Sequence, residues 1–143
     1  MMGVAPLARS VGLSLSLAAV AAVPCAMAAE SSLSAYQGAW LQGGASCSDV
    51  YSFTTKGTSF REPVDIFAPA FIISGSRLRT PLASCRVKAV RPAGDRQVLT
   101  LGCANAVSAN DVTVQMSAEP DGTLKRYFNA QDTTGSIYQR CSR

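Results

Sequence analysis

The sequence predicts an all-β fold: a small antiparallel up-and-down barrel or sandwich of about seven or eight strands with two disulfides. First, apolar and polar residues alternate with the period of two that is typical of strands. Second, short turn sequences rich in glycine, proline and aspartate separate these segments, and no 11-residue window has the apolar stripe of a helix. Third, four well-separated cysteines follow residue 28, at Cys47, Cys85, Cys103 and Cys141.

The first 28 residues have the pattern of a secretory signal peptide. Arg9 is the only charged residue before the apolar run from Val11 to Val23, which a proline ends. Ala26 and Ala28 place small side chains at the −3 and −1 positions that signal peptidase requires. The run is shorter than the roughly 20 residues of a membrane-spanning helix, so we expect cleavage after Ala28 and no transmembrane segment in the mature chain.

The domain organisation follows from this pattern. We expect a cleaved signal peptide over residues 1–28 and a single all-β domain over residues 29–143, located in the periplasm or secreted. Lipidation of Cys25 is not expected, because Pro24 occupies the place where a lipidation motif has glycine or alanine. The oxidising compartment makes two disulfides the natural state of the four remaining cysteines, with three possible connectivities.

The composition argues against catalysis, metal binding and nucleic-acid binding. Lysine and arginine number 13 and removal of Arg9 leaves 12, against 9 acidic residues, which is too mild a positive charge to predict a nucleic-acid partner. The sequence has no histidine, so it has no Ser-His-Asp or Cys-His arrangement. It also has no C-x-x-C pair of the kind that binds zinc. We therefore expect no catalytic residue, cofactor or metal. Glu62 and Asp65 are the one carboxylate pair that we single out as a candidate acid and base.

The best-defined local structure is a hairpin centred on Gly94. Cys85 and Cys103 lie nine residues before and after it, so folding the chain there pairs them directly. The same register pairs Val87 with Leu101 and Ala89 with Leu99 on one face, and Lys88 with Thr100 on the other. A slip of one residue would put the cysteines on opposite faces, so the sequence predicts a Cys85–Cys103 bridge. Cys47 then remains for Cys141, which would tie an early strand to the last one.

The remaining segments complete the strand set. Ser31–Ser34 is expected to form a loose N-terminal arm. On the strand expected at 123–129, Leu124 and Phe128 mark the apolar side. Besides the hairpin, strands are expected at 48–54, 59–62, 71–73, 77–79, 112–117, 123–129 and 136–141.

Gly38-Ala39-Trp40 near the start of the first strand, followed by Cys47, carries a resemblance to known families. The triplet resembles the opening of lipocalin-like barrels, and the resemblance implies that Trp40 plugs the closed end of the barrel. It is also similar to the opening of the small periplasmic inhibitors of secreted metalloproteases, in which a mobile N-terminal arm enters the protease cleft. In that resemblance, residues 31–33 correspond to the arm.

Two surface features are candidate binding sites. Arg77 and Arg79 share one strand face, and Arg86 and Lys88 share the polar face of the Gly94 hairpin, so adjoining faces would form a basic patch for an anionic envelope component. The alternative is ordinary solvent-facing charge that protects strand edges. The apolar run 66–73 is a candidate lining for the mouth of a ligand-binding barrel, with core packing as its alternative.

From these observations we expect an exported, non-enzymatic β-domain that binds an envelope component or a small ligand. The alternative is a periplasmic inhibitor of a secreted protease or other hydrolase. An apolar cavity would favour the first, and an ordered arm projecting from residues 29–34 would favour the second.

Overall fold

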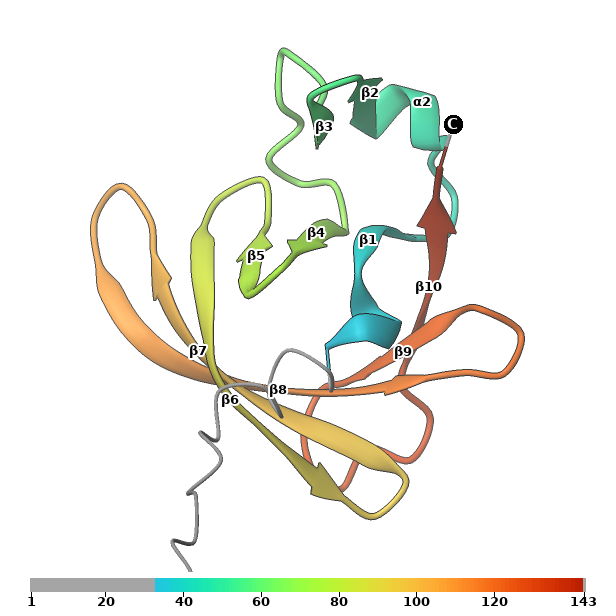
Figure 1. Cartoon of the computed structure of the whole chain (residues 1–143), viewed down its shortest axis with the longest axis vertical. Helices are drawn as coiled ribbons and strands as arrows, with labels where there is room; N and C mark the ends of the chain where they lie inside the picture. The colour runs from blue at the N-terminus through green and yellow to red at the C-terminus, as the bar shows by residue number, and fades with distance from the viewer. Residues whose placement is uncertain (1–32, 143) are drawn as a thin grey trace, which may run out of the picture.

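The computed structural model describes residues 33–142, and these form an eight-stranded closed antiparallel barrel with a small two-stranded sheet beside it (Figure 1). Around the barrel the strands follow one another as β1 (Gly38–Gln42), β10 (Ser136–Cys141), β9 (Leu124–Tyr127), β8 (Ala109–Ala118), β7 (Arg96–Ala104), β6 (Ser84–Ala93), β5 (Arg77–Arg79) and β4 (Ala70–Ser74). The predicted all-β class is confirmed, and of the two architectures the chain adopts the barrel.

Two short helical turns and one hairpin complete the described structure. The 3-10 turn η1 (Ser34–Tyr36) precedes β1, and the single turn α2 (Cys47–Val50) leads into the hairpin of β2 (Tyr51–Thr54) and β3 (Gly57–Phe60). None of the helices in residues 33–142 has the length and apolar character needed to cross a bilayer. The predicted signal peptide and the lipidation question at Cys25 concern residues outside the described range.

Both predicted disulfides are confirmed, Cys47–Cys141 and Cys85–Cys103. Cys85 and Cys103 are directly opposed on β6 and β7 with Cα atoms 4.0 Å apart. Cys47 and Cys141, with Cα atoms 5.7 Å apart, join the start of α2 to the end of β10. Disulfides are typical of proteins in an oxidising compartment, which is compatible with a periplasmic or secreted location.

The predicted register of the β6–β7 hairpin holds only next to the cysteines. Val87 pairs with Leu101 as predicted, but a bulge at Lys88 then shifts the register by one residue, so that Val90, not Ala89, pairs with Leu99. The extra residue brings the larger Val90 side chain onto the core cluster inside the barrel. It also leaves a two-residue turn in which Gly94 has φ of +65°, a conformation that glycine adopts without strain.

Trp40 and the 3-10 turn lie together at one end of the barrel. Trp40 is 1% exposed, and its Nε1 donates a hydrogen bond to the Tyr36 carbonyl over 2.8 Å. The Arg140 guanidinium lies 4.5 Å from the centre of the Trp40 ring and donates hydrogen bonds to the carbonyls of Ala35 and Gln37. These contacts fix η1 across the end of the barrel and close it.

The predicted loose arm is wrong at its last residues. Leu33 is 2% exposed and belongs to the core cluster inside the barrel, together with Tyr36 and Trp40. Burial of this side chain is favourable by about 2 kcal/mol, which is enough to hold the segment in place. Residues 29–32 of the predicted arm lie outside the described range.

A second apolar cluster lies outside the barrel wall, beneath the β2–β3 hairpin. Ala39, Leu41 and Ile72 face outward from β1 and β4 and pack against Tyr51 and Val50. A helical turn replaces the first half of the strand predicted over 48–54. The bridge to β10 fixes Cys47 at the start of this turn, and one helical turn then brings Val50 onto the outer cluster.

Tyr51 links this outer layer to the barrel. Its hydroxyl donates to the carbonyls of Trp40, at 2.6 Å, and Phe71, at 3.1 Å, which are paired residues on β1 and β4. Burial raises the pKa of the Tyr51 phenol above its usual value of 10.

Removal of the Cys47–Cys141 bridge should destabilise the protein more than removal of Cys85–Cys103. The bridges close segments with sequence separations of 94 and 18 residues, and the longer closure restricts the unfolded chain more. The chain-entropy relation gives a difference of about 1 to 1.5 kcal/mol in the free energy of unfolding. Denaturant unfolding of the two double-serine variants measures it, and equal losses would contradict the prediction.

Replacement of Tyr51 by phenylalanine should lower the free energy of unfolding by about 1 to 2 kcal/mol, because two buried carbonyls lose a shared donor. The folded-state pKa of Tyr51 is raised, so its stabilising contribution is complete below pH 10 and declines as the pH rises above that value. The variant should therefore lose less stability than the wild type between pH 9 and about pH 11. Thermal melting across this range tests both statements, and parallel alkaline curves would contradict the second.

Candidate functional site

A cavity of about 480 Å³ opens at the end of the barrel opposite η1. In an antiparallel barrel successive connections alternate between the two ends. The connections 61–69, 80–83 and 105–108 lie at the cavity, whereas the β4–β5 turn lies at the closed end, where Gly75 and Gln37 exchange hydrogen bonds. The volume falls within the range of pockets for small molecules.

The cavity walls are mostly apolar because inward positions of six strands carry apolar side chains. The paired residues Leu101 and Val112 lie on β7 and β8, and Val114 and Met116 continue the β8 wall. The remaining apolar lining includes Phe71, Leu78, Cys85, Cys103 and Tyr138. The Met116 carbonyl accepts a hydrogen bond from the Tyr36 hydroxyl, over 3.4 Å, so the base of the cavity rests on the closed end.

The predicted apolar run 66–73 divides between the cavity and the two apolar clusters. Ile66 and residues 68–71 line the cavity. Ile72 packs in the cluster outside the barrel, and Ile73 packs in the core inside it. The outcome combines both interpretations of the run, because its first part is a mouth segment and its last part is strand β4.

Apolar side chains also surround the mouth of the cavity. Of the seven large apolar residues that are exposed in the described part of the chain, five lie there. Phe67 is 86% exposed and Val107 is 90% exposed, and the other three are Ile66, Leu82 and Val112. Exposed apolar groups of this number at one opening are typical of a ligand entrance.

Arg126 is the one charged residue in the lining. It pairs with Met116 on β8 and with Ser136 on β10. Because paired residues in an antiparallel sheet have side chains on the same face, Arg126 faces the cavity as Met116 does. Within residues 33–142 its guanidinium makes no hydrogen bond or ion pair. Arg126 was not among the site residues predicted from the sequence. The available signal was its position between Leu124 and Phe128 on the predicted apolar side of a strand. Phe128 itself lies beyond the end of β9 and is 89% exposed.

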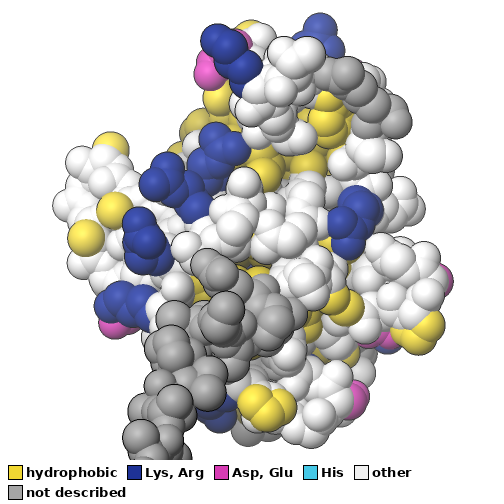
Figure 2. All heavy atoms as spheres, in the orientation of Figure 1, with side chains coloured by type: hydrophobic (Ala, Val, Ile, Leu, Met, Phe, Trp, Pro, Cys, Tyr) yellow, Lys and Arg dark blue, Asp and Glu magenta, His cyan; other side chains and the backbone are white. Residues whose placement is uncertain are grey.

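The predicted basic patch is only partly formed. Figure 2 shows lysine and arginine side chains gathered over β5 and β6. Arg77 and Arg86 are directly opposed on these strands, and both are exposed. Arg79 donates a hydrogen bond to the Thr58 carbonyl over 2.9 Å, and Lys88 forms an ion pair with Asp111 at 2.7 Å. The structure therefore leaves two arginines, not four free cations, on this surface.

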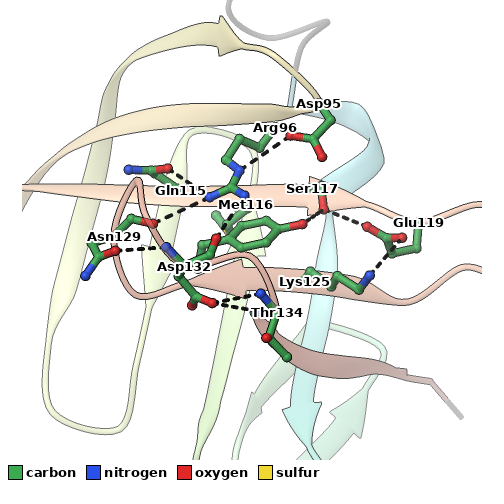
Figure 3. A network of polar contacts seen from close by, with 12 residues as sticks. Asp95, Arg96, Gln115, Met116, Ser117, Glu119, Lys125, Asn129, Asp132 and Thr134 are labelled. Atoms are coloured by element: carbon green, nitrogen blue, oxygen red, sulfur yellow. Dashed lines mark hydrogen bonds and ion pairs between the residues drawn. The ribbon is translucent and has the colours of Figure 1, made fainter.

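Arg96, which belongs to the same stretch of sequence, is part of a separate structural network (Figure 3). Its guanidinium lies 3.6 Å from the centre of the Tyr127 ring and donates a 3.0 Å hydrogen bond to the Asp132 carbonyl. The Asp132 carboxylate accepts hydrogen bonds from the amides of Phe128, Gly135 and Thr134, and these bonds lower its pKa. Arg96 thus fixes the β9–β10 connection against the outer wall.

The carboxylates show no arrangement for catalysis or metal binding in the described residues. Glu62 and Asp65 are both exposed, and an Asp65 oxygen accepts a hydrogen bond from the Phe67 amide, which is a local turn contact. Residues 33–142 contain no group of three or more cysteine, aspartate or glutamate side chains placed to hold a metal ion. The cavity is thus the feature of the described structure that best fits a site.

Comparisons of the chain with protein-family models, with curated proteins and with solved structures gave no match.

The directly opposed Arg77 and Arg86 should repel each other, so Arg77→Glu should stabilise the protein. Replacing a like-charge pair by an opposite-charge pair across two strands is worth about 0.5 kcal/mol. Urea unfolding at low salt measures the gain, which should shrink at high salt as the charges are screened. Arg91→Glu is the control, because it changes the net charge equally but lies opposite Val98. An equal effect of both variants would contradict the prediction.

Proposed function

We propose that this protein is an exported binding module that holds a small, largely apolar ligand in the barrel cavity. The observation that carries the proposal is the cavity itself, about 480 Å³ in volume and lined mostly by apolar side chains. A barrel of eight strands can fill its interior with side chains alone, so space of this size at one end is a specific property of the side chains present.

The two ends of the barrel support this proposal by their difference. Trp40, Tyr36 and Leu33 fill the closed end, whereas the β8 wall of the cavity carries smaller inward residues, Val112 and Val114. Exposed apolar groups around the mouth give a ligand a path from solvent into the cavity.

The alternative of a hydrolase inhibitor has less support. An inhibitor of the expected kind uses a mobile arm, but Leu33 is buried in the core of the barrel. An anionic partner on the basic surface also has less support than an apolar ligand in the cavity. Two of the four predicted basic residues, Arg79 and Lys88, are already bound to Thr58 and Asp111. The exported location rests on the sequence pattern of residues 1–28 together with the two disulfides.

Binding of an environment-sensitive apolar dye, N-phenyl-1-naphthylamine, tests the proposal. The mature protein should enhance its fluorescence in a saturable manner with one site per chain. Val112→Trp should weaken this binding at least tenfold, because Val112 lies at the mouth and its side chain faces the cavity.

Ile137→Trp is the matched control, since Ile137 is also an exposed strand residue but lies outside the cavity lining. It should bind the dye as the wild type does. Absence of saturable binding by the wild type, or equal weakening by both variants, would overturn the proposed function.

A further inference from the structure

We propose that Arg126 is the anchor for an acidic headgroup, so that the ligand of the cavity is an amphiphile with a carboxylate at one end and an apolar body. This inference rests on the proposed function and specifies the class of ligand. Arg126 is the one charged side chain in the lining, and it has no ion-pair or hydrogen-bond partner in residues 33–142.

The position of Arg126 in the sheet makes its inward direction a fixed property of the barrel. Its neighbours on both sides, Met116 and Ser136, are paired with it by backbone register. Leu124, two residues earlier on the same strand, faces inward as well and is completely buried. A shift of one residue would expose Leu124, so the burial of leucine holds arginine on the cavity face.

The contrast with the other arginines near the barrel ends strengthens the inference. Arg140 stacks on Trp40 and binds two carbonyls, and Arg96 stacks on Tyr127 and binds the β9–β10 connection. Each of these side chains is held by the protein and contributes to its structure. Arg126 has no comparable partner among residues 33–142, and the cavity wall that it faces is mostly apolar.

The chemistry of the guanidinium group specifies the headgroup. Its planar donors match the two oxygens of a carboxylate, and such charge-assisted pairs are stronger than neutral hydrogen bonds. Arg126 itself is exposed to solvent, which places the headgroup towards the mouth. The apolar body then extends from the Arg126 side chain along Val114 and Leu101.

Competition against the bound dye tests this assignment with three compounds that share one alkyl chain: decanoate, 1-decanol and decyltrimethylammonium. Decanoate should displace the dye at a concentration at least tenfold lower than decanol, and the cation should be the weakest. Arg126→Gln should remove the preference for decanoate and leave the affinity for decanol unchanged. Arg126→Lys should retain a smaller preference, because the charge remains without the planar pair of donors.

Arg86→Gln is the matched control, because it removes the same charge from an exposed position on β6 that is not part of the cavity lining. It should keep the full preference for decanoate. If the dye binds and decanoate and decanol compete equally, or if Arg86→Gln reduces the preference as much as Arg126→Gln, the anchor is overturned and the cavity proposal stands. If the dye does not bind at all, the proposed function fails first.

Discussion

Closure of the barrel depends on strand β1, which is hydrogen-bonded to β10 on one edge and to β4 on the other. Without it, the sheet would present two free edges, which are open to pairing with other chains. The strand is short, and the surrounding structure reinforces both of its seams. The Cys47–Cys141 bridge lies beside the seam with β10, and the Tyr51 hydroxyl binds one carbonyl from each strand of the seam with β4.

The same strand divides the interior into a filled half and an open half. Trp40 points inward from β1 and, with the 3-10 turn, closes one end. Residue sizes then fall towards the other end, where the connections that surround the mouth carry exposed apolar groups in place of a second plug. Rigidity and empty space therefore come from different parts of one sheet. A binding site that is held by a rigid scaffold loses little conformational freedom when a ligand enters.

Sequence patterns predicted the features that depend on local or symmetric spacing. The disulfide pair around Gly94 and the final strand Ser136–Cys141 follow from alternation and from equal distances to a turn. The bulge at Lys88 was not predictable, because alternation gives the two registers almost equal apolar pairs. The turn α2 was missed because it depends on a bridge to a residue 94 positions away. Arg126 was missed because a single arginine on an apolar face has meaning only once the face is known to line a cavity.

The Cys85–Cys103 bridge has a further consequence through its location, since both residues line the cavity. Both cysteine side chains face the space that a ligand would fill. Occupancy of the barrel would therefore shield this bridge from a thiol reagent, whereas Cys47–Cys141 lies outside the barrel wall and would react at an unchanged rate. The chain thus contains two chemically identical groups in different surroundings. If the cavity holds a ligand, Cys85–Cys103 would report on its occupancy and Cys47–Cys141 would serve as the internal reference.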